Sequence, residues 1–204
     1  AIAQAASHCG NRPVRTTATV GGNLCNALPS ADMVPVLLAL DGTCFIADED
    51  SQESVPLTDF FTGPRRTVLG DRLLVGVALP AEAAGRVCLS RKLMRTAEDI
   101  SLVQVAVALS LQEGRISSPR IALGAVAPVP KRATLAEAVL EDLGPGEATA
   151  EKIEEAGRIA AGECDPITDH RAGAEYRRDL VRVLTERLLG EALNILEGAE
   201  GEER

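Results

Sequence analysis

A run of threonine, glycine and asparagine near the start of the chain has the composition of an anion-binding loop. It spans residues 16–26, TTATVGGNLCN. Paired glycines have no Cβ atoms, so the backbone at Gly21 and Gly22 can bend into positive φ and expose successive N–H groups at close range. Thr19 and Asn23 flank the pair with side chains that can donate hydrogen bonds. A phosphate or a pyrophosphate would fit there, although the residues alone favour a tight turn between strands.

Two charged residues could act on the same ligand. A phosphate repels a carboxylate, so Asp32 would bind a hydroxyl or a ring N–H of the ligand. The equal alternative is that Asp32 is the N-cap of the helix that follows it. Lys92 could place a positive charge against a cofactor ring that becomes anionic on reduction. Taken alone, its sequence context favours a solvated side chain.

The sequence contains no motif of a catalytic acid, base or nucleophile. GxSxG, Walker and HExxH patterns do not occur, and the pair Glu98-Asp99 favours a solvated turn. Five cysteines and two histidines show no zinc spacing. We therefore predict no catalytic residue and no metal ligand. Unpatterned cysteines and the lack of a secretory signal pattern favour a reduced, cytoplasmic protein.

The composition is that of a folded water-soluble chain. It has 204 residues, 46% hydrophobic and 25% charged, with a formal net charge of -9. The apolar stretches are shorter than the roughly 18 residues that a membrane span needs. The negative charge and the lack of a basic run make nucleic acid an improbable partner. The first residues, AIAQAA, have the pattern of a helix interior, so we expect further residues upstream.

Two blocks of elements are expected to position these residues. In the first, to about residue 79, the pattern predicts a short apolar helix over 32–40, strands over 43–47 and 73–79, and a buried aromatic pair, Phe60-Phe61. Small residues at 81–85 predict a linker.

The second block opens with a predicted strand over 87–93. Residues 102–111 alternate between large and small side chains, which predicts a half-buried strand, and Gly114 turns the chain into a returning strand over 121–126. Thr134 and Glu137 fit a capping box, and a helix is expected over about 147–161. A last helix carries an apolar stripe of Leu180, Leu184, Leu188, Ala192 and Ile195. Together these elements predict that the second block is a small antiparallel sheet covered by helices.

Residues 7–35, SHCGNRPVRTTATVGGNLCNALPSADMVP, resemble the second flavin-binding segment of the molybdenum hydroxylase flavoproteins. That family includes the FAD-binding medium subunits of carbon monoxide dehydrogenases and the FAD domain of xanthine dehydrogenases. The resemblance continues through VPLTDFFTGPRRTVLGDRLLVGVALP, RKLMRTAEDISLVQVAVAL, RIALGAVAPVPKRA and DHRAGAEYRRDLVRVLTERLL, in the family's order. It covers nearly the whole chain.

The resemblance implies an α+β fold and a cofactor, FAD. The chain would be the C-terminal part of a two-subdomain FAD-binding α/β domain (1–82), a small antiparallel sheet packed with a three-helix bundle (86–196), and an acidic tail (197–204). Residues implied to hold the FAD diphosphate are Thr19, Val20, Gly21, Gly22 and Asn23. Asp32 would contact FAD through its polar groups, and Leu74 and Lys92 would lie near the flavin.

The implied function is that of an oxidoreductase subunit in a hetero-oligomer. FAD would pass electrons from [2Fe-2S] clusters on a partner subunit to NAD or another acceptor, while a large molybdopterin subunit oxidises the substrate. The sequence departs from the family at Leu28, where a small residue is usual. It also lacks the family's N-terminal subdomain with a second glycine loop. The alternative is therefore a docking module or fragment that no longer binds FAD.

Overall fold

A four-stranded antiparallel sheet in the order β6-β7-β8-β9 lies at the centre of the computed structural model, which describes residues 1–202. The strands are β6 (Val87–Leu93), β7 (Val103–Gln112), β8 (Arg115–Gly124) and β9 (Lys131–Arg132). Gly114 turns β7 into β8 with φ of +74°, a conformation that glycine adopts without strain. The antiparallel pair predicted around this turn is confirmed.

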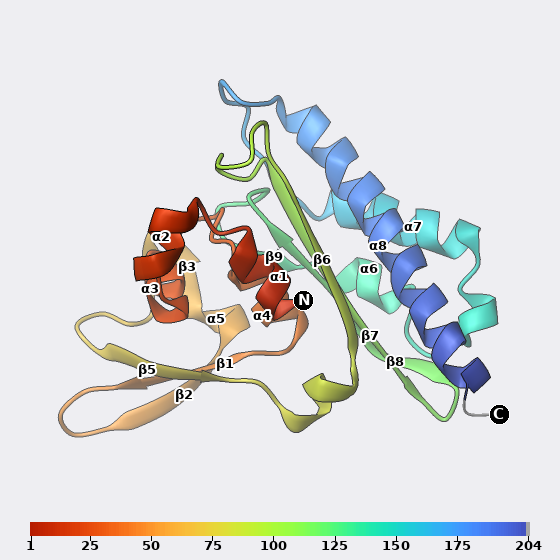
Figure 1. The fold of residues 1–204 in the computed structure, drawn as a ribbon, viewed down its shortest axis with the longest axis horizontal. Coiled ribbons are helices and arrows are strands. Elements are labelled where there is room, and N and C mark those ends of the chain that lie inside the picture. Colours follow the sequence, from red (N-terminus) through yellow and green to blue (C-terminus); the bar gives the residue numbers. More distant parts are fainter. Residues whose placement is uncertain (203–204) are drawn as a thin grey trace.

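Helices cover one face of this sheet (Figure 1). They are α6 (Thr134–Ala138), the 3-10 turn η2 (Pro145–Glu147), α7 (Ala150–Gly162) and α8 (Ala174–Glu202). Fully buried leucines and valines of β7 and β8 pack with Leu188 and Leu189 of α8 in one hydrophobic core. Mixed helices and sheets confirm the predicted α+β class.

The first block consists of shorter elements on the opposite side of the sheet (Figure 1). Its helices are α1 (Ile2–Ser7), α2 (Arg12–Thr17), α3 (Val20–Cys25), α4 (Val34–Ala39) and α5 (Leu57–Phe60). Its strands are β1 (Thr43–Ala47), β2 (Gln52–Pro56), β3 (Phe61–Gly63), β4 (Arg66–Thr67) and β5 (Leu73–Ala78), with β1 between β2 and β5. Phe60 and Phe61 are buried edge to face, as expected, with ring centroids 5.2 Å apart.

Strand β7 is buried on both faces, so the prediction of a half-buried strand is wrong. Its valines face α8, and its alanines Ala106 and Ala108 pack against the core of the first block, which centres on α4. Small side chains there let α4 approach the sheet closely. The central sheet therefore supports both cores.

Residues 81–85, predicted as a linker, connect β5 to β6 as a 3-10 turn, η1 (Ala81–Gly85), in which Ala83 is buried. The predicted capping box of Thr134 and Glu137 is wrong. Glu137 does not cap α6, because its carboxylate accepts hydrogen bonds from the N–H of Ile121 and from Arg132. In the predicted stripe of α8, Leu184, Leu188 and Ala192 are buried and Leu180 is partly buried, whereas Ile195 is 48% exposed.

The C-terminal helix is longer than expected. Backbone of residues 197–202, part of the predicted acidic tail, continues α8. Residues 203–204 of that tail lie outside the described residues. None of the helices in the described part is both long and apolar enough to span a membrane.

Candidate functional site

The TVGGN segment forms the first turn of α3, and not a bent glycine loop or a turn between strands. Thr19 is the N-cap, and its Oγ1 accepts a hydrogen bond from the N–H of Gly22 at 2.9 Å. Its carbonyl accepts one from the N–H of Asn23 at 3.0 Å. Gly21 and Gly22 have helical backbone without positive φ. Threonine is a favoured N-cap, and this local preference starts the helix.

Two amides of this turn remain open. Within the described residues, no acceptor is found for the N–H groups of Val20 and Gly21. The first N–H groups of a helix have no partner inside it and favour an anion. Val20 is 43% exposed and Gly21 is partly exposed, so the turn faces solvent. The backbone can therefore donate two hydrogen bonds to an external acceptor.

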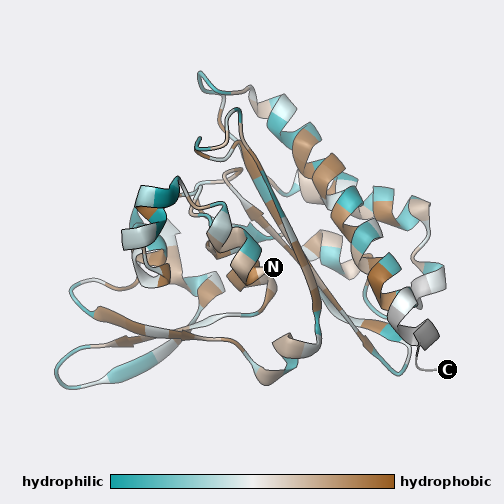
Figure 2. Cartoon of the chain, in the orientation of Figure 1, coloured by the Kyte–Doolittle hydropathy of each residue, from teal (hydrophilic) through white to brown (hydrophobic). Residues whose placement is uncertain are grey.

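A shallow apolar groove adjoins the open amides. It has a volume of about 370 Å³ and is lined by Val20, Gly21, Leu37, Leu74–Val77 and Leu79. A Cβ atom built on Gly21 would lie 3.9 Å from Leu74 Cδ2, so the structure brings these two predicted site residues together. Figure 2 shows β5 as apolar, in contrast to the hydrophilic β2. An apolar ligand group linked to an anion would suit both features.

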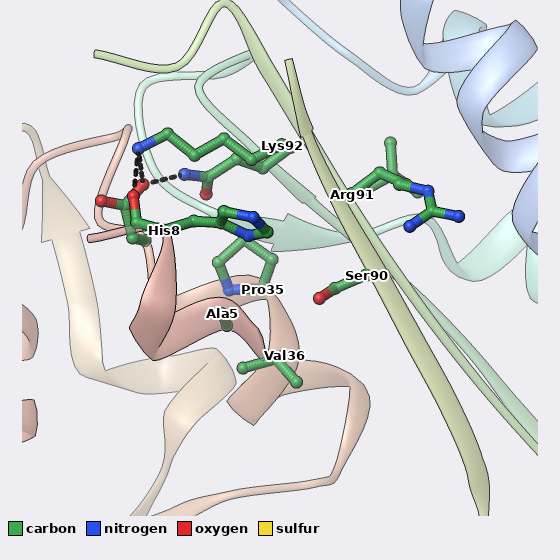
Figure 3. Close-up of a pocket in the computed structure, with 10 residues that line it drawn as sticks. Ala5, His8, Pro35, Val36, Ser90, Arg91 and Lys92 are labelled. Atoms are coloured by element: carbon green, nitrogen blue, oxygen red, sulfur yellow. Dashed lines mark hydrogen bonds and ion pairs between the residues drawn. The ribbon is translucent and has the colours of Figure 1, made fainter. Parts of the chain in front are cut away.

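Asp32 and Lys92 form an ion pair in a second part of the site. Lys92 Nζ, on β6, lies 2.9 Å from Asp32 Oδ1, and it also donates to the carbonyl of His8 at 2.9 Å (Figure 3). Only 8% of the Lys92 side chain is exposed, so the solvated alternative is wrong. Asp32 is not the N-cap of α4 either, because Met33 takes that position and no side chain caps the helix.

Asn23 connects the two parts. Its Oδ1 accepts a hydrogen bond from the N–H of Met33 at 3.1 Å, which ties α3 to the segment that carries Asp32. The side-chain oxygen of Asn23 is therefore occupied by the protein itself, while its amide nitrogen remains the group that could donate to a ligand.

The thiol of Cys9 lies beside the ion pair. Burial raises its pKa, the negative charge of Asp32 raises it further, and Lys92 opposes this effect. A raised pKa keeps the thiol protonated at neutral pH. Cys9 is thus a neutral neighbour of the carboxylate and not a thiolate nucleophile.

Two residues that bind Asp32 were missed from the sequence. Gln104 Nε2 donates to Asp32 Oδ1 at 2.6 Å, and Ser101 Oγ donates to the same oxygen at 3.3 Å. Gln104 shares the small-residue face of β7 with Ala106 and Ala108. A glutamine among alanines on a buried face was the available signal, since such a side chain needs a polar partner.

No group of three or more His, Cys, Asp or Glu side chains that could hold a metal ion is found among residues 1–202. The groups that this site offers a ligand are two backbone amide donors, one carboxylate acceptor, one ammonium group and an apolar groove. These groups fit a ligand that is anionic at one point and has polar and apolar parts elsewhere.

Two domain families match consecutive parts of the chain. Residues 1–82 match the FAD binding domain in molybdopterin dehydrogenase, and residues 90–192 match the CO dehydrogenase flavoprotein C-terminal domain. The xanthine dehydrogenase FAD-binding subunit of Escherichia coli O157:H7 is 32% identical over 95% of this chain and 66% of its own length. The glyceraldehyde dehydrogenase medium chain of Sulfolobus acidocaldarius is 31% identical over 86% of this chain and 62% of its own.

Solved structures agree with these sequence matches. Carbon monoxide dehydrogenase from Hydrogenophaga pseudoflava superposes with a TM-score of 0.87 at 30% identity, over 93% of this chain and 66% of that one. Quinoline 2-oxidoreductase from Pseudomonas putida 86 gives a TM-score of 0.82 at 29% identity, over 94% and 66%. The chain thus spans about two thirds of the length of its relatives. It belongs to the family of FAD-binding medium subunits of the molybdenum hydroxylases.

Proposed function

We propose that this chain binds FAD and serves as the electron-transfer flavoprotein of a molybdenum hydroxylase. Its partners would be a subunit with [2Fe-2S] clusters, which supplies electrons, and a large molybdopterin subunit, which oxidises the substrate. NAD or another acceptor would receive the electrons. Bound FAD would supply the redox chemistry between one- and two-electron carriers. The protein's own residues bind and orient it.

The observation that carries the proposal is the open turn of α3. The N–H groups of Val20 and Gly21 are free to bind a diphosphate, and Thr19 fixes their geometry through its bond to Gly22. This arrangement fits the group because backbone amides at a helix start bind phosphate oxygens without a charged side chain. Leu74, on the adjoining groove, offers an apolar surface for a ring.

Asp32 and Lys92 would act on the polar parts of the cofactor. The carboxylate can accept a hydrogen bond from a ring N–H or a hydroxyl. The ammonium group of Lys92 would favour negative charge on the reduced ring, even though Asp32 already pairs with it.

One observation favours the alternative, a docking module without flavin. Of the four amides from Val20 to Asn23, those of Gly22 and Asn23 already bond to Thr19. Only half of the turn is then available to a diphosphate. The two hypotheses differ in whether flavin is present when the chain is purified from its own host with its co-purifying polypeptides.

The test is the flavin content of that complex, measured by visible absorbance, for the natural chain and for Gly21→Val. A Cβ at Gly21 has ordinary contacts only, so the fold should survive while the side chain blocks access to the amides. We expect FAD affinity to fall about tenfold or more with an unchanged unfolding temperature. Gly85→Val is the matched control, because no atom lies within 4 Å of its added Cβ.

The outcomes separate the two hypotheses. If the natural complex contains no flavin, the proposed FAD-binding function is wrong and the docking alternative is favoured. If the natural complex is yellow and Gly21→Val retains as much FAD as Gly85→Val, FAD binds elsewhere and the assignment of the α3 turn is wrong.

A further inference from the structure

Three donors from the central sheet and its connecting loop converge on one oxygen of Asp32. Lys92 Nζ lies 2.9 Å, Gln104 Nε2 2.6 Å and Ser101 Oγ 3.3 Å from Asp32 Oδ1. Among the described residues, no N–H or O–H group bonds to the other oxygen, Oδ2, and the Cys9 thiol lies beside the carboxylate. The carboxylate is 15% exposed. Its Oδ1 is thus held by three donors, while Oδ2 accepts no N–H or O–H hydrogen bond from the described residues.

The orientation of the Gln104 amide is determined by these contacts. Its nitrogen donates to Asp32 and to Ser101 Oγ at 2.5 Å, while Oε1 is buried and has no partner in the described part of the chain. A flipped amide would set its oxygen against the carboxylate. An apolar residue would avoid the unpartnered oxygen, so packing alone does not explain a glutamine here.

The neighbouring strand and helix leave room for this one side chain. Gly124 of β8 is paired with Gln104 across the sheet. A Cβ at Gly124 would lie 2.6 Å from Gln104 Oε1 and 2.7 Å from Pro35 Cγ, which is too close for either. The missing Cβ therefore allows Gln104 to extend between the sheet and α4 and to reach Asp32.

We propose that Gln104 is a positioning residue, which holds the Asp32 carboxylate through Oδ1 so that Oδ2 accepts a hydrogen bond from a polar N–H or hydroxyl group of the bound flavin nucleotide. The inference rests on the proposed function. Gln104 sits in the second block and Asp32 in the first, so the sheet of one block orients the ligand-binding group of the other. Its amide also offsets part of the carboxylate charge.

The variant Gln104→Met removes the donor and nearly preserves the volume. It also removes the buried unpartnered oxygen, so we expect an unchanged unfolding temperature. FAD affinity of the complex, measured by readdition to the deflavinated protein, should fall about three- to tenfold. The flavin midpoint potential should shift to more negative values, because a less compensated carboxylate disfavours the anionic reduced ring.

Gln112→Met, at the exposed end of the same strand, is the matched control and should change none of these quantities. In an Asp32→Ala background, Gln104→Met should have no further effect on affinity or potential, since it acts through the carboxylate.

Each other outcome overturns the inference. If the natural complex binds FAD and Gln104→Met keeps its affinity and potential, Gln104 does not position Asp32, while the proposed function stands. If the variant unfolds or loses flavin only in proportion to its stability, the role of Gln104 is structural. If the natural complex binds no FAD, the proposed function fails first and the inference fails with it.

Discussion

The two blocks of this molecule differ in the length of their helices and strands and in how many side chains these elements bury. The second block has strands of ten residues and a helix of 29, and most of its large apolar side chains are buried in one core. Four helices of the first block have only six residues, and in α2 none is buried. Helices this short are not stable alone, so they depend on packing against the rest.

This difference shows where the binding groups can be placed. A long, fully bonded sheet leaves few backbone groups free, whereas a short surface helix such as α3 exposes its first amides. The first block carries those amides, and the second block gives them a rigid base through Ala106 and Ala108 beneath α4. We therefore expect the first block to fold only when the second block is folded.

The largest effect should come from the core of the second block. Leu188 of α8 is fully buried, so Leu188→Ala should lower the free energy of unfolding by about 3 kcal/mol. Because both cores share the central sheet, circular dichroism should record one cooperative transition that includes the first block. Leu135→Ala, at a position that is 65% exposed, is the control and should cost little.

Hydrogen exchange distinguishes the alternative. If the amides of β1 stay protected under conditions in which Leu188→Ala unfolds α8, the first block is stable without the second. The conclusion that the first block depends on the second block for its stability would then be wrong.

The next effect concerns the ionic contact between the blocks. Asp41 follows α4 and accepts hydrogen bonds from Arg86, Arg120 and Arg132 at 2.7–3.2 Å. Burial alone would raise the pKa of Asp41, but the hydrogen bonds from Arg120 and Arg86 outweigh it and lower the pKa below its usual value. Asp41→Asn should cost about 2 kcal/mol at neutral pH, since hydrogen bonds to charged groups are the stronger ones.

The pH dependence follows from the direction of that shift. A carboxyl group with a lowered pKa in the folded state stabilises the protein above its unfolded pKa, near 3.9, and the stabilisation is lost as pH falls through the folded value. Urea unfolding from about pH 6 to pH 3 should therefore show a steeper loss in the natural protein than in Asp41→Asn. Asp59→Asn, at an exposed position, should show the same pH dependence of stability as the natural protein. If Asp41→Asn shows that same dependence, the Asp41 carboxylate does not stabilise the contact between the blocks.

The sequence predicted the positions of strands well, but it did not predict which residues the polar side chains contact. Strands over 43–47 and 87–93 have the predicted bounds, because alternation and β-branched residues are local signals. The local pattern allows a cap at Asp32, favours a solvated side chain at Lys92 and predicts half of a capping box at Glu137. In each case the partner lies on another element, such as Lys92 for Asp32 and the Ile121 amide for Glu137. Contacts across the fold outweigh local preferences and have no local pattern.

The smallest effect on stability should come from the cap of α3. Thr19→Ala removes the Oγ1 acceptor of the Gly22 amide, a loss of about 1 kcal/mol for an N-cap. Since α3 is a short surface helix, this loss should fray α3 without moving the global unfolding midpoint.

FAD retained after gel filtration should nevertheless fall severalfold, because the amides of Val20 and Gly21 are no longer held in place. Thr16→Ala, which removes a hydroxyl that bonds the Pro13 carbonyl in α2, is the matched control. Equal flavin content in the two variants would mean that the Thr19 cap has only a structural role and that its bond to Gly22 does not prepare the α3 turn for FAD.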